Sequence, residues 1–328
     1  MGHGIYMNSL GFVVMSNKSI AYQLLVRGHP VFLVNFRGSK YSTSHKTLAK
    51  NDSAYWKFSF HQMAQYDLPV VMNLVAQKTG GAKAVYIGFS MGTTVINIYC
   101  ILYPQEATKR LVGVIEMAPV ANLTKIRSIV GILSPSWPIL KPIANSIWHG
   151  ILLPRNDYLK EFCSTHVIVI FLCYTITAFV FGANYAMLDP LRMPVVMQQC
   201  PDVISTMVVD HYYQIIRHKQ FLQYDYGYEQ NIEKYGSPFP HPYNFSEIKV
   251  PITLFVGLND FVAEAKNSRI LYNNLPSTSR CGFKVIPDSH WTHDAFVFSK
   301  DMHLYLNNEI LNTIPIMENN LCSQYRHD

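Results

Sequence analysis

The sequence predicts an α/β protein with a mostly parallel sheet and one helical insertion. Apolar runs typical of buried strands alternate with segments of helical periodicity before residue 121 and again after residue 244. This alternation is typical of parallel strands joined by crossover helices. Between 122 and 243 the chain is helix-like, punctuated by proline and rich in Trp, Tyr, Met and His. We therefore expect a core formed by 1–121 and 244–328, and a helical cap or lid formed by 122–243 over the carboxyl ends of the strands.

The expected core elements follow one another along the chain. A helix is expected over 20–25, because a Ser-Asn pair precedes it and a glycine follows it. The apolar run at 30–35 predicts a buried strand. A longer helix is expected over 60–78, where apolar residues recur at helical spacing: Met63, Tyr66, Val70 and Leu74. Further strands are expected at 85–87, 111–117, 252–257 and 283–286, with a last helix at about 296–311.

The central motif is the run GFSMG at 88–92, which has the pattern G-x-S-x-G. A β-prone run enters it and helix-compatible residues follow, as a nucleophile elbow requires. Such a turn strains the backbone of its serine, and the flanking positions must lack side chains so that strand and helix can pass closely. The pattern predicts that Ser90 is a nucleophile.

A serine nucleophile needs a base within hydrogen-bond reach and an acid that orients the base. In this geometry the chain order is Ser, then Asp or Glu, then His. Asp260 is the candidate acid, because it follows the expected strand at 252–257 directly. The base is expected before the last helix, where His290 and His293 both qualify and periodicity does not separate them. Three other acids are rivals with weaker strand context: Asp210, Asp225 and Glu264.

An oxyanion hole requires two backbone N–H groups, one after the nucleophile and one from an early His-Gly loop. Met91 supplies the first. His3 and Gly4 lie upstream of the elbow, as the geometry demands, so the N–H of Ile5 is the expected second donor.

The composition of the chain favours an apolar ligand and argues against nucleic-acid binding and a metal site. Of 328 residues, 49% are hydrophobic and only 15% charged, which indicates a lipid-facing surface or a deep apolar pocket. The net charge of +6 is spread along the chain, so nucleic acid is not an expected partner. The six cysteines form no C-x-x-C pair, and we expect no metal and no organic cofactor. Four N-x-S/T sequons favour a glycoprotein on the secretory route.

The stretch 167–183 approaches the length of a membrane span and is almost entirely apolar. It lacks flanking Lys or Arg and is barely long enough. We therefore favour a buried helix of the cap over a stable membrane span.

These motifs resemble those of a known family, the animal acid lipases of the gastric and lysosomal type. Residues 35–42 read NFRGSKYS, similar to the family's N-x-R-G-N-x-Y-S, with Ser39 in place of the usual Asn. The run from 56 to 69 resembles its W-x-F-S…E-M…Y-D-L-P, with Gln62 in place of the usual Glu. The elbow reads GFSMG where the family usually has G-H-S-Q-G. Because the oxyanion contact is made by a backbone N–H group, we expect these side-chain differences to alter the properties of the catalytic site without abolishing catalysis.

The resemblance covers nearly the whole chain and extends to the acid and the base. Residues 257–263 read GLNDFVA and match the family's G-x-x-D-x-L/V-A, which implies Asp260. Residues 293–296 read HDAF and resemble its H-x-D-F, with Ala295 in place of the usual Asp. This implies His293 rather than His290 as the base. His3-Gly4 resembles the family's oxyanion loop.

The resemblance implies an α/β-hydrolase fold and a serine hydrolase that cleaves carboxylic esters of neutral lipids, such as triacylglycerols or sterol esters, at a lipid–water interface. It implies catalytic roles for Ser90, Asp260 and His293, and a secreted or lysosomal location. Family members carry a leader and further strands before the His-Gly loop, so we expect this chain to be truncated at its N-terminus. The alternatives are a catalytically inactive lipid-binding or storage protein and a short-chain carboxylesterase.

Overall fold

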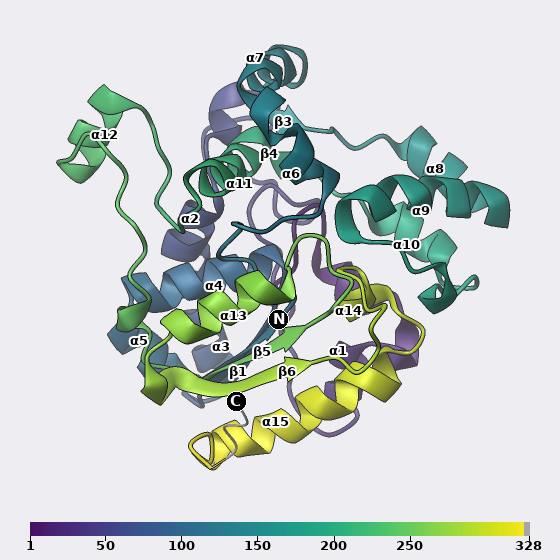
Figure 1. Ribbon diagram of the computed structural model, residues 1–328, viewed down its shortest axis with the longest axis vertical. Coiled ribbons are helices and arrows are strands. Elements are labelled where there is room, and N and C mark those ends of the chain that lie inside the picture. Colours follow the sequence, from purple (N-terminus) through teal and green to yellow (C-terminus); the bar gives the residue numbers. More distant parts are fainter. Residues whose placement is uncertain (325–328) are drawn as a thin grey trace.

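The centre of the molecule is a sheet whose strands all run parallel, in the spatial order β1, β2, β5, β6 (Figure 1). The computed structural model describes residues 1–324. Within that range the strands are β1 (Ala84–Phe89), β2 (Leu111–Met117), β5 (Ile252–Val256) and β6 (Arg280–Val285). All of β5 and nearly all of β2 is buried, which explains why both appear in the sequence as continuous apolar runs. The predicted α/β fold with a mostly parallel sheet is confirmed.

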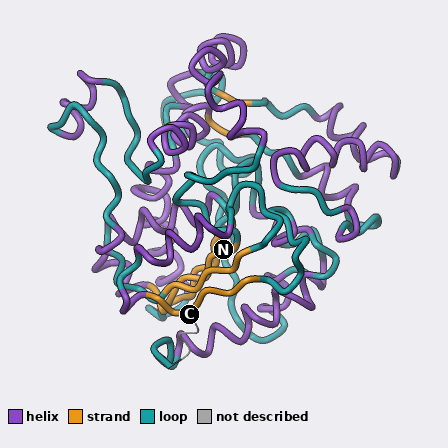
Figure 2. Tube along the Cα trace, viewed as in Figure 1, coloured by secondary structure: helices purple, strands orange, loops and turns teal. Residues whose placement is uncertain are grey.

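Helices cover both faces of this sheet, with α4 and α13 on one side and α15 on the other (Figure 1). Figure 2 shows the sheet strands as one group surrounded by helices and loops. The helices of the core are α1 (Ile20–Leu25), α2 (Phe60–Gln62), α3 (Leu68–Lys78), α4 (Met91–Leu102), α5 (Pro104–Arg110), α13 (Ala265–Asn274), α14 (Ala295–Phe298) and α15 (Asn308–Glu318).

The predicted strand at 30–35 is wrong, because this segment is extended but belongs to no strand. In the described part of the chain its backbone bonds run to Met1, from the Met1 amino group to Phe32 O (2.6 Å) and from Val34 N to Met1 O (3.0 Å), and the side chain of Asn35 accepts from Ser9 N (3.0 Å). The next residue, Gly2, already pairs with Gly88 of β1 as an isolated bridge. The segment therefore lies beside β1 without enough backbone pairing to form a ladder.

The expected helices at 60–78 and 296–311 exist with different details. The first contains a π-helical turn at Met63–Asp67 between α2 and α3. A π turn adds a residue and shifts the helical phase, so Val70 and Leu74 are exposed while Leu68 and Met72 are buried. The second is divided into α14 and α15, with a break after Phe298 and a π-helical turn before α15.

The segment 122–243, for which we keep the name cap, is helical apart from two short paired strands. Figure 1 shows α6, α7 and α11 at the top, α8 to α10 at the right, and α12 at the end of a projecting arm. Its helices are α6 (Ile129–Leu133), α7 (Trp137–Trp148), α8 (Asp157–Thr165), α9 (Val167–Phe181), α10 (Met193–Gln199), α11 (Thr206–His218) and α12 (Tyr228–Tyr235). The strands β3 (Ile151–Leu152) and β4 (Ile204–Ser205) pair antiparallel.

Helix α9 is not the buried helix that we expected from its composition. It packs against α8 and α10 at the edge of the cap, where Tyr174 and Ala178 are buried. Its opposite side is open to solvent, with Ile168 70%, Leu172 62% and Ile176 68% exposed. Among the described residues no helix has the length and apolarity needed to cross a membrane. Helix α9 thus presents an apolar face outward.

The structure settles the cysteine pairing that the sequence left open. Cys163 and Cys173 form a disulfide between α8 and α9, and Cys281 and Cys322 join β6 to the chain after α15. The remaining cysteines, Cys100 and Cys200, are unpaired.

Candidate active site

Ser90 stands on the sharp turn between β1 and α4. Its backbone is in the left-handed region (φ 52°, ψ −116°), which is strained for a residue with a side chain. A Cβ at Gly88 would lie 3.0 Å from the Gly92 backbone, and one at Gly92 would lie 2.2 Å from Gly2 O. The two glycines of the motif are therefore required by close backbone packing on either side of the serine.

The structure brings the predicted serine, histidine and aspartate side chains together. His293, in the loop before α14, has Nε2 2.8 Å from Ser90 Oγ. Its Nδ1 is 2.8 Å from Asp260 Oδ2, in the loop after β5. The other carboxylate oxygen, Oδ1, accepts hydrogen bonds from the N–H groups of Val262 (2.8 Å) and Ala263 (2.7 Å). These two bonds fix which oxygen faces the imidazole.

All three side chains are buried, with exposed fractions of 4% for Ser90, 1% for His293 and 0% for Asp260. Burial lowers the pKa of His293, but the negative charge and hydrogen bond of Asp260 raise it, and the pKa lies above its ordinary value of 6.5 overall. Burial raises the pKa of the adjacent Asp294 to about 7. The site therefore favours a protonated imidazole once a proton reaches it.

The segment that contains the predicted oxyanion donors lies directly beside the elbow. Gly2 N donates to Ile87 O and Phe89 N donates to Gly2 O, both at 3.0 Å, and a Cβ at Gly4 would lie 3.1 Å from Ser90 Cβ. Met91 is the first residue of α4. The first N–H groups of a helix have no partner within that helix, so the Met91 N–H is available beside Ser90.

The side chain of His3 holds this segment in place. It is 2% exposed, and burial lowers its pKa to about 4, so the imidazole is neutral near pH 7. Its Nε2 accepts from Phe36 N (3.1 Å), and Nδ1 is 2.8 Å from Gly4 O. These partners assign the proton to Nδ1. His3 therefore links the loop before Ile5 to the segment at 35–42.

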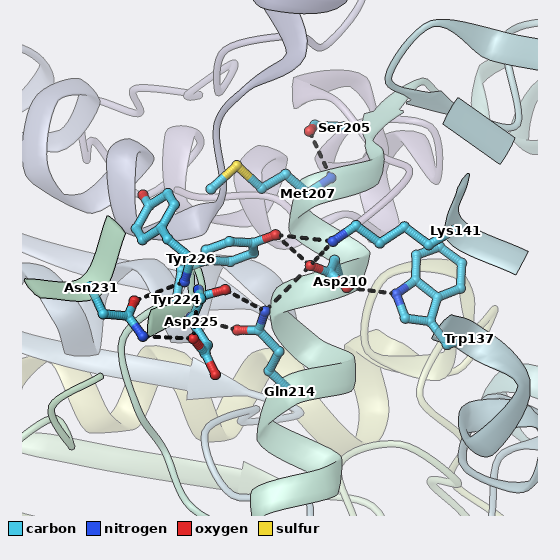
Figure 3. A network of polar contacts seen from close by, with 11 residues as sticks. Trp137, Lys141, Ser205, Met207, Asp210, Gln214, Tyr224, Asp225, Tyr226 and Asn231 are labelled. Carbon is cyan, nitrogen blue, oxygen red and sulfur yellow. Dashed lines mark hydrogen bonds and ion pairs between the residues drawn. The ribbon is translucent and has the colours of Figure 1, made fainter. Parts of the chain in front are cut away.

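Two of the rival acids, Asp210 and Asp225, lie instead in a polar network between α7, α11 and the arm that carries α12 (Figure 3). Asp210 accepts from Trp137 Nε1 (2.8 Å) and Lys141 Nζ (2.7 Å). Asp225 accepts from Asn231 Nδ2 (2.7 Å). Their carboxylates are engaged within the cap, away from the imidazole of the candidate base.

The other rivals are also placed elsewhere. His290 is at the surface, with a side chain that is 76% exposed and lies 3.5 Å from the Asp288 carboxylate. Glu264 forms an ion pair with Arg127. Neither residue is hydrogen-bonded to Ser90 or to His293 within the described part of the chain.

Arg127 is a residue of the site region that our reasoning from sequence missed. Its guanidinium donates to Leu258 O (3.0 Å) and Asp260 O (3.2 Å), and its backbone N donates to Phe261 O (3.1 Å). It thereby fastens the start of the cap to the loop that carries the candidate acid. No local motif marks such a residue, since its partners, two carbonyl groups and the Glu264 carboxylate, lie more than 130 positions away along the chain.

Comparisons with known proteins agree with this fold. Residues 1–137 match a protein family described as "alpha/beta hydrolase fold". The chain is 30% identical to the human "Lysosomal acid lipase/cholesteryl ester hydrolase", over 94% of this chain and 77% of that protein. It is 28% identical to "Lipase 1" of Drosophila melanogaster, over 95% of this chain and 70% of the relative.

Solved structures resemble the chain in fold. A putative lipase from Sulfolobus solfataricus superposes with a TM-score of 0.59 at 13% identity, covering 95% of this chain and 84% of the other. The monoglyceride lipase of Saccharomyces cerevisiae gives a TM-score of 0.54 at 16% identity, covering 97% and 84%. At these identities the likeness speaks for the shared architecture alone.

Proposed function

The chain belongs to the acid lipase family of α/β-hydrolases, and from this premise we propose that it is a serine hydrolase that cleaves carboxylic esters of neutral lipids. The observation that carries the proposal is the continuous hydrogen-bonded series from Ser90 through His293 to Asp260, with both contacts at 2.8 Å. A nucleophile, a base and an orienting acid are in direct contact in a buried site.

The reaction follows from these contacts. His293 Nε2 takes the Ser90 hydroxyl proton while Oγ attacks the ester carbonyl carbon. Asp260 stabilises the resulting imidazolium and remains ionised. The imidazolium then donates its proton to the leaving alcohol as the tetrahedral intermediate collapses. Water, activated in the same way by His293, attacks the acyl-enzyme and releases the fatty acid.

The negative charge on the tetrahedral oxygen needs donors that are already aimed at it. We assign this role to the backbone N–H groups of Ile5 and Met91. Neither group donates a hydrogen bond to another backbone carbonyl in the structure of residues 1–324. Met91 is buried and Ile5 half-buried, and donors left without a backbone acceptor next to the nucleophile support this assignment.

The cap supports an apolar ester as the substrate. Its outward side chains include Ile132 (71% exposed), Ile139 (70%) and Ile168 (70%). These side chains lie on three helices of the cap, α6, α7 and α9, and apolar surface exposed in this way can contact lipid. We therefore propose that the enzyme acts at a lipid–water interface on long-chain esters such as triacylglycerols or sterol esters, in lipid degradation.

A secreted or lysosomal location fits the surface and the cysteines. Asn17, Asn51 and Asn244 of the sequons are exposed, and Asn122 is half-buried. Disulfides such as Cys163–Cys173 persist in oxidising compartments. We propose that the protein is a glycoprotein of the secretory route.

A serine-reactive fluorophosphonate probe tests the proposal. We expect covalent labelling of the purified protein at Ser90, mapped by peptide mass spectrometry, and none in Ser90→Ala. Hydrolysis of a long-chain triacylglycerol emulsion should exceed hydrolysis of a soluble short-chain ester. Absence of labelling would favour an inactive lipid-binding protein, and preference for the short ester would favour a carboxylesterase.

A further inference from the structure

The imidazole of His293 contacts two phenylalanine rings that come from different parts of the fold. The Phe181 ring is stacked on it, with centroids 5.3 Å apart and planes inclined by 11°. The Phe89 ring, from the residue before Ser90, lies 5.1 Å away at 42°. Phe89 belongs to the core strand β1, whereas Phe181 is the last residue of cap helix α9. One face of the candidate base is therefore covered by the cap.

The backbone after α9 is tied to the same site. The His293 N–H donates to Phe181 O at 3.1 Å. Asn259, which precedes Asp260, donates from its side chain to Ala183 O at 3.0 Å. Residues 181–184, which we call the strap, therefore contact the loop of the acid and the loop of the base.

Two further features hold the strap in position. Asn184 Nδ2 donates to His290 O at 3.1 Å. Gly182 has φ +97°, and a Cβ there would lie 2.3 Å from Asn259 O. The strap therefore packs against the loop that carries the acid, so closely at residue 182 that only glycine fits there.

The charged groups around the imidazole come from the core loops. Asp260 is hydrogen-bonded to Nδ1, and Asp294, in the same loop as His293, is the other acid that raises the pKa of the base. The strap adds no formal charge, but the face of an aromatic ring attracts a cation that lies within about 6 Å of its centroid. A ring stacked in parallel also restricts rotation of the imidazole about its Cβ–Cγ bond.

We propose that Phe181 is a positioning residue for the base, whose ring sets the plane of the His293 imidazole and stabilises its protonated form. This inference rests on the proposed function, because it assigns Phe181 a role through His293. It also implies a link between cap and chemistry: a displacement of α9 would withdraw the ring and the strap from the base. The fixed plane keeps Nε2 directed at Ser90 Oγ while the proton is transferred.

The test compares Phe181→Leu with the ring-retaining Phe181→Tyr and with Phe179→Leu as a matched control. Phe179 lies on the same helix and is 62% exposed. With a soluble short-chain ester, we expect Phe181→Leu to lower kcat about tenfold with little change in KM. The acid limb of kcat/KM should move to lower pH by about half a unit to one and a half units, because the protonated base loses its aromatic partner. Phe181→Tyr should restore both values, and Phe179→Leu should match the wild type.

An NMR titration of ¹⁵N-histidine-labelled protein, with His293 assigned by His293→Gln, gives a readout that does not need turnover. The pKa of His293 should fall in Phe181→Leu and recover in Phe181→Tyr. If Phe181→Leu does not fold, as judged by thermal unfolding, Phe181→Met replaces it with the same expectation.

An unchanged pKa in the folded aliphatic variant would overturn the proposal, as would equal impairment of Phe181→Leu and Phe181→Tyr. Failure of the proposed function has a different signature, namely a wild-type protein that the fluorophosphonate probe does not label. The NMR comparison decides the role of Phe181 in that case as well.

Discussion

Replacement of Asp260 by asparagine should abolish most activity through a change of tautomer at His293. Asp260 Oδ1 accepts from two loop N–H groups, Val262 (2.8 Å) and Ala263 (2.7 Å). In Asp260→Asn the amide oxygen must keep these bonds, so the amide NH₂ group takes the place of Oδ2. That group faces His293 Nδ1, which is 2.8 Å away in the wild type.

A donor opposite Nδ1 requires Nδ1 to be the unprotonated nitrogen, so the proton moves to Nε2. A protonated Nε2 cannot accept the proton of Ser90. The equivalent aspartate-to-asparagine change in a serine protease lowers kcat by about 10⁴ with the geometry retained. We expect a decrease of about that size here, with a thermal unfolding midpoint close to that of the wild type because the two loop bonds survive.

The assay is hydrolysis of a soluble ester by the wild type, Asp260→Asn and the control Asp294→Asn. Asp294 is in the same loop as His293, and burial raises its pKa to about 7. Since this acid is already about half protonated at pH 7, the amide should alter kcat less than tenfold. The reasoning is refuted if Asp260→Asn retains more than a tenth of wild-type activity, or if the two amides impair the enzyme equally.

The remaining predictions concern stability and the acid loop. Burial lowers the pKa of His211 to about 3 from 6.5, so the unfolded chain takes up this proton at a higher pH than the folded chain. His211 alone should lower the free energy of unfolding by about 1.4 kcal/mol per pH unit between pH 6 and pH 3, and His211→Gln should show a slope shallower by that amount in denaturant titrations. Burial raises the pKa of Glu116 to about 8 from 4.5, so Glu116 destabilises the folded state increasingly as pH rises from 4.5 to 8. Glu116→Gln should therefore raise the thermal unfolding midpoint more at pH 7.5 than at pH 5, and equal gains at the two pH values would contradict this. Arg127→Met removes the bonds to Leu258 O and Asp260 O and should lower kcat about tenfold, whereas Lys125→Met, two residues earlier, should not.

Local patterns in the sequence were enough for the parallel sheet and for the candidate residues of the site. A strand buried on both faces must be a continuous apolar run, and a tight turn between strand and helix must have glycine where backbones touch. The elbow around Ser90 obeys the second rule, since Gly92 has no room for a Cβ beside Gly2 O. Asp260 and the pair His290 and His293 became candidates because residues at the carboxyl ends of parallel strands gather at one edge, and the family resemblance then favoured His293.

The choice between rival histidines and between rival acids depended on information that no short stretch of sequence contains. His290 and His293 are three residues apart in one loop, and from the residues alone neither was preferred. Their separation in space arises because His293 N–H bonds to Phe181 O, while His290 is turned to solvent. Asp210 and Asp225 were rivals in the sequence. Only the packed cap shows that α7 engages the carboxylate of Asp210 and that Asn231 of α12 engages that of Asp225.

Tertiary structure alone decided the orientation of the cap and what it brings to the base. Helix α9 is apolar on every side, so periodicity could not show which side is buried. That depends on the position of α8 and α10, and it leaves Ile168 and Leu172 in solvent while Phe181 reaches His293. The sequence by itself determined the tight turn at Ser90, the buried strands and the candidate side chains, because each of these follows from neighbouring residues. The contact between Phe181 of the cap and His293 follows only from the packed whole.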